Sequence, residues 1–317
     1  MISIIIVNYN TSEILGKCID SVFLFEKDVK SEIIIVDNFS DEINIKLLKD
    51  ISLIHSSVKI ILLDKKVSFS EANNIGYKNS SAGEYLLIMN PDIIFTEPLL
   101  NKFIGIAESK SGFGALCPFL KGVDGKFQYK YFQKEPSVCR FIFFDSVVSR
   151  LFENSERLKK RYLYDSKIQI DTNELQYVEH IPCAFFFTTS EIFAEVGMMD
   201  TSYELFFEDM DLSYKIGRKY SIAVIPFLPV LHLSGTSFKT KDNWWMYGRF
   251  IFGMINFAYK HSGINKGKKI EFTASLNSKI ALLMEKVKGL FGKVDEFRIK
   301  KHRFLLELLE EKKLINK

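Results

Sequence analysis

Three acidic residues, Glu208, Asp209 and Asp211, stand within four positions directly after the apolar run Leu205–Phe207. Carboxylates this close repel one another, so such clusters are typical of helix caps, proton-accepting bases or metal ligands. On a helix, Asp209 and Asp211 would point about 200° apart, so at most two of the three can serve one site. Alternatively, the cluster is structural, and its acids are stabilised by the helix dipole in the first turn of a helix. This explanation suits Glu208 or Asp211 better than it suits all three residues.

A further carboxylate, Asp92, follows the strand-like run Tyr85–Asn90 in the turn Asn90-Pro91-Asp92. Proline fixes one backbone angle and cannot extend the ladder of strand hydrogen bonds. Ligands of open α/β sheets bind outside the carboxyl ends of the strands. Asp92 is therefore a candidate ligand-binding group on a stiff edge, although Asn, Pro and Asp are also common in ordinary turns.

A single histidine, His232, follows a β-rich stretch in the motif Leu231-His232-Leu233-Ser234-Gly235. Together with Asp92 it could hold a hard divalent ion whose coordination is completed by diphosphate oxygens and water. A purely structural histidine is the alternative.

Polar side chains also follow the first two strand-like runs: Asn8, Tyr9 and Asn10 after the first, and Asp37 and Asn38 after the second. Neither GxGxxG nor GxxxxGK[ST] is present, so a nucleotide here would be held by Asn and Asp side chains. A carboxylate such as Asp37 can accept a hydrogen bond from a base imide or a ribose hydroxyl. Capping of the following turn is its alternative use.

A polar turn, Ser68–Gly76, runs into a helical pattern and contains Asn73, Asn74 and Gly76. Helix N-termini favour anions, so this segment is a further candidate to face the diphosphate or sugar of a donor.

Residues 1–120 alternate strand-like and helical patterns. The strand-like runs are Ile2–Tyr9, Glu32–Asp37, Val58–Leu63 and Tyr85–Asn90, with helical patterns between them that include Ile14–Phe25 and Glu71–Asn79. This alternation predicts βαβ units, and the consecutive apolar residues predict strands covered by helices on both faces. We therefore expect an α/β fold with a Rossmann-like, mixed, mainly parallel sheet.

The second half is less regular. A strand is expected at Val178–Thr188, a helix from Glu191, and another from the acidic cluster to Lys219. The aromatic and basic segment Phe127–Tyr177 has no clean period and is interpreted as an insertion or lid that reads a variable partner, or as a peripheral helical excursion.

The C-terminal part becomes rich in Lys, Leu and Glu at helical spacing from about Ser275. Such a basic amphipathic helix, over 275–317, is typical of a membrane-surface or partner-binding element, or of a helix that packs on the domain or pairs with a second copy. The aromatic helix expected at Trp244–Tyr259 is interrupted by Arg249 and is too short to span a bilayer.

The overall composition is that of a globular chain: 317 residues, 47% hydrophobic and 26% charged, with a formal charge of +4. This mild charge gives no sign of nucleic-acid binding. The four cysteines form no CxxC pair, which argues against a disulfide framework or a zinc site. We expect no signal peptide, and a cytoplasmic protein that is peripheral on the inner face of the cell membrane if the tail binds lipid.

Taken in order, the motifs VNYN, VDNFSD, SFSEANNIG, NPD, FFEDMDL and HLSG resemble the inverting nucleotide-sugar glycosyltransferases of family 2, which have the GT-A fold. Within the family the similarity is to the rhamnosyltransferase-like group, with NPD in place of DxD. It implies a transferase domain over 1–262, with a nucleotide-binding half over 1–120 and an acceptor and catalytic half over 121–262. The C-terminal helical extension would cover 263–317.

The resemblance also implies roles for the site residues. Asp37 would bind the nucleobase, with Tyr9 and Asn10 around it, and Asp92 would bind Mg²⁺ or Mn²⁺ on the donor diphosphate, with Asn90 in place of the motif's first Asp. His232 would be a further metal ligand, and in the acidic pair that begins at Glu208 the second residue, Asp209, would be the general base.

The expected partners are a dTDP- or UDP-linked sugar, with rhamnose or another deoxyhexose as the sugar, and a glycan or lipid-linked acceptor of surface polysaccharide synthesis. A sugar-nucleotide-forming nucleotidyltransferase and a non-catalytic scaffold of a polysaccharide complex are the alternatives. Against the first, NYNTSE stands where a Gly- and Lys/Arg-rich triphosphate loop would be.

Overall fold

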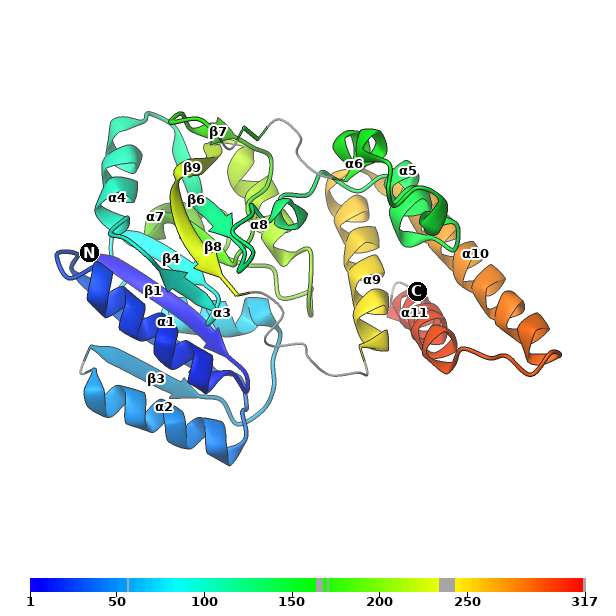
Figure 1. Ribbon diagram of the computed structural model, residues 1–317, viewed down its shortest axis with the longest axis horizontal. Coiled ribbons are helices and arrows are strands. Elements are labelled where there is room, and N and C mark those ends of the chain that lie inside the picture. Colours follow the sequence, from blue (N-terminus) through cyan, green and yellow to red (C-terminus); the bar gives the residue numbers. More distant parts are fainter. Residues whose placement is uncertain (56, 164–167, 170, 234–242, 316–317) are drawn as a thin grey trace. The chain divides into compact units, whose positions relative to one another are not determined.

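The computed structural model describes residues 1–55, 57–163, 168–169, 171–233 and 243–315 (Figure 1). Ser234 and Gly235 of the His232 motif lie outside these residues. Two compact units form the chain. The first, here called the sheet unit, comprises Met1–Phe132, Lys167–Glu204 and Glu208–Lys239, and the second, the helical unit, comprises Gln133–Ser166, Leu205–Phe207 and Thr240–Lys317.

The sheet unit contains a mixed sheet flanked by helices. Its strands are β1 (Ile2–Asn8), β2 (Ser31–Asp37), β3 (Val58–Leu62), β4 (Tyr85–Met89), β5 (Ile93–Phe95), β6 (Phe113–Lys121), β7 (Gln176–Tyr177), β8 (Phe185–Thr189) and β9 (Ser221–His232). Its helices are α1 (Ser12–Phe25), α2 (Glu42–Ile54), α3 (Phe69–Lys78), α4 (Leu100–Ser109), α7 (Ser190–Glu195) and α8 (Glu208–Gly217), with a 3₁₀ turn, η1 (Tyr129–Tyr131).

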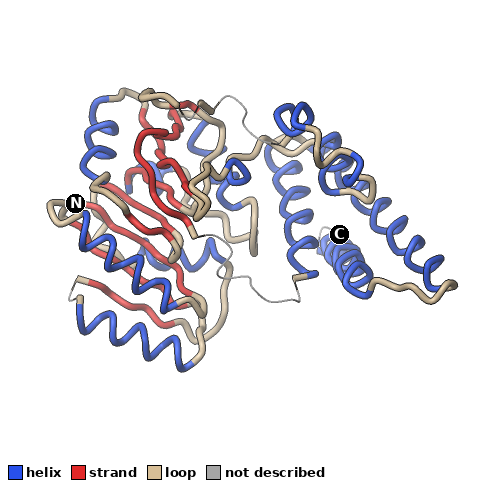
Figure 2. The backbone as a smooth tube through the Cα atoms, viewed as in Figure 1, coloured by secondary structure: helices blue, strands red, loops and turns tan. Residues whose placement is uncertain are grey.

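The strand order is β3-β2-β1-β4-β8-β6-β9-β5, with β7 paired to β9 (Figure 2). β1 to β4 are parallel to one another, whereas β8 runs antiparallel to both β4 and β6. The parallel pairing of β6 with β9 completes a sheet whose paired residues are mostly parallel. This confirms the predicted α/β class.

The first strands are covered on both faces. α1 and α2 contact each other on one face, and α3 packs on β1 and β2 (Figure 1). A Cβ atom on Gly76 of α3 would come within 2.5 Å of Ile5 and 3.1 Å of Val36, so only glycine allows this close approach. Burial on both faces explains why β1 is apolar on consecutive residues.

The predicted strand Val178–Thr188 is shorter than expected, because β8 begins only at Phe185. The preceding residues form a turn in which the Phe185 N–H donates to the Pro182 carbonyl. This turn matters for the site, since it presents His180 and Cys183 rather than ladder residues.

The helical unit contains α5 (Val138–Arg140), a π-helical turn η2 (Phe141–Asp145), a 3₁₀ turn η3 (Ser149–Leu151), α6 (Glu156–Tyr162), α9 (Trp244–His261), α10 (Ile264–Gly289) and α11 (Glu296–Ile315). α9, α10 and α11 pack on one another. α9 therefore belongs with the C-terminal helices, and the predicted boundary after residue 262 does not coincide with the compact units. The segment Phe127–Tyr177 is likewise divided between the two units.

None of the helices in the described part of the chain is both long and apolar enough to cross a membrane. The aromatic helix expected at Trp244–Tyr259 is present as α9.

Candidate active site

The acidic cluster opens helix α8, as its sequence predicts, and its members face different ways. Asp211 is fully buried: its Oδ1 accepts from the Tyr203 hydroxyl at 3.4 Å, and its Oδ2 lies 3.4 Å from Lys215 Nζ. Asp209 is partly exposed, with 26% of its side-chain surface accessible. Asp211 therefore has a structural environment, and Glu208 and Asp209 remain as the pair able to do chemistry.

Glu208 and Asp209 have different environments. Glu208 is buried, and its Oε2 has no hydrogen-bond partner among the described residues. Burial, followed by repulsion from Asp209, raises the pKa of Glu208 to about 8. Burial thus favours the protonated form of Glu208, and Asp209 is the carboxylate of the pair that is accessible to a substrate.

The two residues before Glu208 have an unusual backbone conformation. Phe206 and Phe207 both have positive φ, 70° and 69°, which is uncommon for residues with a Cβ. Such outliers cluster at functional sites because the strain must be offset by surrounding packing. The strained turn sets the point at which α8 begins.

His180 lies beside Asp209 and is a residue that the sequence did not indicate. Its Nε2 is 3.3 Å from Asp209 Oδ2, although neither ring nitrogen makes a hydrogen bond of good geometry with the described residues. The neighbouring Ile181 exchanges two 3.2 Å hydrogen bonds with Ser213 Oγ. Positions 209 and 213 lie one turn apart on the same face of α8, so this anchor aligns His180 with Asp209.

Asp92 and His232 are brought together at the ends of β4 and β9. Asp92 Oδ1 lies 3.4 Å from His232 Nε2, and both side chains are buried. The Gln128 side chain donates to the His232 carbonyl at 3.0 Å through Nε2 and accepts at 2.7 Å from Nδ1 through Oε1. Because an amide oxygen can only accept, Nδ1 is the donor of the second bond, and Nε2 is the ring nitrogen on the side of Asp92.

An imidazole nitrogen and a carboxylate oxygen on one side fit a divalent ion such as Mn²⁺. In the described part of the chain, no group of three or more His, Cys, Asp or Glu side chains is placed to hold a metal ion. Asp92 and His232 therefore fit as two protein ligands of a site that needs oxygens from a ligand or from water to be complete.

A backbone hydrogen bond joins the turn that contains Asp92 to the segment before β8. The Asn90 N–H donates to the Ala184 carbonyl at 3.0 Å. The adjacent Cys183 thiol is buried, and its pKa is raised first by burial and then by Asp209 and Glu208. Asn90, which stands where a second acid was expected, is thus held beside the turn that leads to the acidic pair.

The third group of expected site residues lies at the ends of β1 and β2. Asn8 is fully buried and its amide donates to Asp37 at 2.7 Å and to Ser12 Oγ at 3.1 Å. The other Asp37 oxygen accepts from the Ser40 N–H at 2.9 Å, so Asp37 does cap the turn after β2. Each carboxylate oxygen can accept a further bond, which leaves Asp37 able to bind a nucleobase as well.

Asn10 and Tyr9 lie on the exposed side of this group. Asn10 has a φ of 53°, and its side chain accepts from the Asp41 N–H at 2.9 Å. The Tyr9 ring is 3.8 Å from Lys66 Nζ, a cation–π contact. An exposed ring and a cation at a sheet edge suit a planar, anionic ligand.

Three other predicted donor-site residues, Asn38, Asn73 and Asn74, make hydrogen bonds within the protein. Asn38 exchanges two hydrogen bonds with the Val67 backbone, at 2.9 and 2.8 Å, and Asn74 exchanges two with the Met199 backbone, at 2.8 and 3.1 Å. Asn73 donates to the Phe69 carbonyl, while its buried Oδ1 has no partner among the described residues. Gly76 packs on the sheet. In the segment Ser68–Gly76, Asn73 therefore has a side-chain oxygen that remains able to accept a hydrogen bond from a ligand.

The mixed sheet has polar groups at the carboxyl ends of β1, β2 and β4, the edge at which open α/β sheets bind their ligands. The sequence profile described as Glycosyl transferase family 2 matches residues 3–189. Because the match covers more than half of the chain, the protein belongs to glycosyl transferase family 2. No match is found among the curated proteins.

Solved structures share the fold at low sequence identity. The structure of GalNAc-T7 with UDP, GalNAc and Mn²⁺ has a TM-score of 0.59 and 16% identity, over 88% of this chain and 50% of that one. The mannosyltransferase PcManGT from Pyrobaculum calidifontis, in complex with GDP-Man and Mn²⁺, has a TM-score of 0.54 and 11% identity, over 98% and 86%. S. aureus TarS 1-349 has a TM-score of 0.51 and 13% identity, over 99% and 91%. The chain thus spans half the length of the first of these.

The raised pKa of Glu208 has a measurable consequence for stability. The folded state holds this proton up to about pH 8, whereas the unfolded chain releases it near the ordinary value of 4.5. The free energy of unfolding therefore falls as the pH rises from 4.5 to 8, by an amount on the order of a few kcal/mol, since one pKa unit corresponds to about 1.4 kcal/mol. Glu208→Gln removes this loss, and its melting temperature should exceed that of the wild type by more at pH 8 than at pH 5. An equal difference at both pH values would contradict the assignment.

Proposed function

We propose that this enzyme transfers a sugar with inversion, from a nucleoside diphosphate to a hydroxyl of the acceptor. The observation that carries the proposal is that the sheet unit contains an accessible carboxylate, Asp209, at the start of α8 beside the buried Glu208, together with the Asp92–His232 pair. A single displacement at a carbon linked to a diphosphate needs two separate groups. One is a carboxylate that accepts the proton of the attacking hydroxyl, and the other is a cation-binding pair at the departing diphosphate.

In this mechanism Asp209 accepts the proton of the acceptor hydroxyl as its oxygen attacks the anomeric carbon. The bond from that carbon to the diphosphate breaks in the same step, so the configuration inverts. His180 stands behind Asp209, where its ring orients the carboxylate. Asp92 and His232 would hold Mg²⁺ or Mn²⁺, which when bound neutralises charge on the departing diphosphate.

The donor is the part of the proposal carried by resemblance. The motifs favour a dTDP- or UDP-linked deoxyhexose such as rhamnose, bound by Asp37 with Tyr9 and Asn10 around the base, and Asn8, Asn38, Asn73, Asn74, Gly76 and Asn90 in the donor site. Two of the structurally similar proteins were solved with UDP or GDP-Man and with Mn²⁺. The acceptor we propose is a glycan or lipid-linked saccharide of surface polysaccharide synthesis, used at the inner face of the cell membrane.

A thermal-shift screen of dTDP, UDP and GDP sugars with and without Mn²⁺ tests the donor. A ligand that binds only the folded state raises its melting temperature, by an amount that grows with ligand concentration. We expect a shift with one class of nucleotide, increased by Mn²⁺, and release of the corresponding nucleoside diphosphate on incubation with its sugar. Absence of any shift and any release across the three classes would contradict the proposed function.

The hydrogen bonds of Gln128 make a prediction about metal binding. Gln128→Leu removes the acceptor that holds the Nδ1 proton of His232, so it should raise the Mn²⁺ concentration for a half-maximal thermal shift about 10-fold or more. Gln128→Glu keeps an acceptor for that proton and should recover much of the affinity. Equal Mn²⁺ affinity in the wild type and in Gln128→Leu would show that His232 is not a ligand.

A further inference from the structure

The helical unit contains a cavity that sugar transfer does not use. Its volume is about 690 Å³, within the range of small-molecule sites. The wall is formed by residues 145–150, by the end of α10 and by the start of α11. Every one of these residues belongs to the helical unit.

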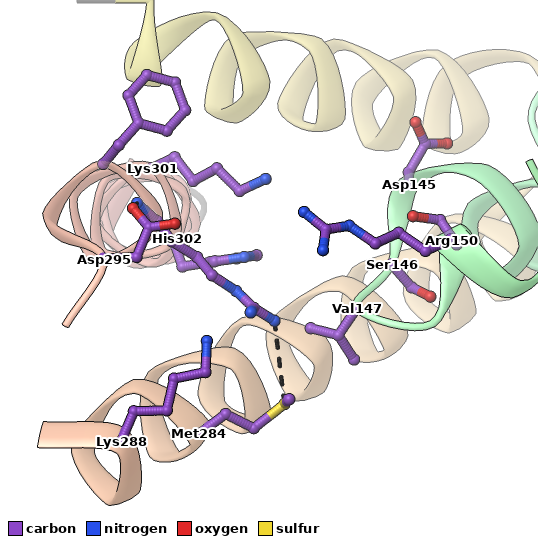
Figure 3. Close-up of a pocket in the computed structure, with 12 residues that line it drawn as sticks. Asp145, Ser146, Val147, Arg150, Met284, Lys288, Asp295, Lys301 and His302 are labelled. Carbon is purple, nitrogen blue, oxygen red and sulfur yellow. Dashed lines mark hydrogen bonds between the residues drawn. The ribbon is translucent and has the colours of Figure 1, made fainter. Parts of the chain in front are cut away.

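The cavity is lined by four cationic side chains, Arg150, Lys288, Arg298 and Lys301. Arg150 and Lys301 point toward each other from opposite walls (Figure 3). Neither makes an ion pair within 4.0 Å with a described residue, whereas Lys288 and Arg298 both pair with Glu285, at 2.7 and 3.2 Å. Two cations that face each other without a close ion pair favour an anionic ligand between them.

The surroundings of Lys301 lower its pKa. Burial lowers its pKa most, and repulsion from Arg298 and Arg150 lowers it further, while Asp295 and Asp145 oppose the change. The Lys301 ammonium also lies 4.3 Å from the centre of the Tyr247 ring. A bound anion would reduce this repulsion.

The wall has two acidic residues, Asp145 and Asp295, against four cationic ones, so its acids offset only part of this charge. Burial raises the pKa of Asp145 to about 6, and its Oδ2 is buried without a hydrogen-bond partner in the described structure. Asp295 accepts from the Arg298 N–H at 3.0 Å at the start of α11. His302 has its pKa lowered to about 4, first by burial and then by Lys301 and Arg298, so it is neutral at pH 7.

Apolar residues lie beside the cations. Val147, Met284 and Phe297 line the cavity, and Met284 and Phe297 are both more than a third exposed. From there an exposed apolar stripe continues along α10 and the turn that follows. Its members are Phe272, Leu276, Ile280, Leu283, Val287, Leu290 and Phe291. Exposed apolar surface of this extent, at helical spacing, is typical of an interaction site.

We propose that the cavity of the helical unit binds the phosphate of a membrane lipid, with Arg150 and Lys301 on the phosphate and the stripe of α10 against the acyl chains. The apolar stripe favours a ligand with an apolar part, and the two facing cations, Arg150 and Lys301, favour an anionic head group. The cavity exceeds the size of one phosphate, so the remaining volume accommodates the glycerol or other group attached to it. The assignment is independent of sugar transfer, because no residue of the sheet unit takes part.

The test is calorimetric titration of the full chain with dihexanoyl phosphatidic acid, dihexanoyl phosphatidylcholine and inorganic phosphate. Hydrogen bonds to charged groups are stronger than those between neutral groups, so Arg150→Met and Lys301→Met should each weaken phosphatidic acid binding about 10-fold or more. Lys300→Met, on the exposed side of α11, is the matched control and should bind as the wild type. Arg150 and Lys300 are both exposed, so we expect Arg150→Met and Lys300→Met to fold as the wild type does.

Three outcomes would overturn the inference. Equal loss in Lys300→Met would show that only the net charge matters. Equal affinity for phosphatidylcholine would show that the cations do not select the head group, and equal affinity for inorganic phosphate would identify a site for free phosphate. A fourth measurement concerns the stripe: Leu283→Gln should reduce binding to vesicles that contain phosphatidic acid, and unchanged vesicle binding would separate the stripe from the cavity.

Discussion

Asp209→Asn is expected to lower the rate of sugar transfer about 10²–10⁴-fold, the usual contribution of a positioned base. The amide keeps the shape of the carboxylate but cannot accept the acceptor's proton. Because Asp209 is partly exposed and Asp92 and His232 are unaltered, donor binding should be preserved. The measurement is the initial rate of transfer together with the donor-induced thermal shift of the same preparation.

Glu191→Gln is a matched control for this variant, since it neutralises an exposed first-turn carboxylate of α7. It should transfer at the wild-type rate. Near-normal transfer by Asp209→Asn would remove Asp209 from the role of base. Loss of the donor-induced shift in that variant would instead assign the residue to donor binding.

Asp92→Ala is expected to abolish both the Mn²⁺-dependent part of the thermal shift and the release of nucleoside diphosphate. Of the two protein ligands that fit a divalent ion, Asp92 is the one that carries charge, and His232 Nε2 lies 3.4 Å from its carboxylate. A hard divalent cation favours oxygen ligands, so the remaining imidazole should not hold it. Titration of Mn²⁺ in the presence of the donor, followed by fluorescence or calorimetry, measures the effect.

Asp64→Ala removes an exposed carboxylate of the same unit and serves as the control. It should leave the Mn²⁺ titration unchanged. If Asp92→Ala still released nucleoside diphosphate at the wild-type rate with Mn²⁺ present, the ion would have to bind elsewhere. Wild-type release in the presence of EDTA would show that transfer does not require the ion.

Much of the sheet unit is predictable from local patterns. Apolar runs such as Ile2–Val7 and Ile33–Val36, each followed by a polar residue, predict buried parallel strands and place Asn8 and Asp37 at their carboxyl ends. The register of β1 with β2 pairs Asn8 with Asp37, so two residues 29 positions apart meet as expected. The family resemblance extended this prediction to Asp92 and Asp209.

Other site residues could not be predicted from the sequence, because the contacts that define them are not local. His180 is next to Asp209 only through the turn before β8 and its anchor on Ser213. Gln128 reaches His232 across 104 positions. No periodicity or spacing links such pairs, since each depends on two irregular segments meeting in the folded chain.

The sequence by itself determined the α/β class, the helical start of the acidic cluster and the carboxylates that carry the proposed chemistry. Their alternation and spacing are properties of single strands and helices, which local backbone geometry sets. The tertiary structure decided which carboxylate of the pair is buried with a raised pKa, what surrounds Asp211, and where cations converge in the helical unit. These depend on burial and on the distance between charges, and both exist only once the segments have packed together.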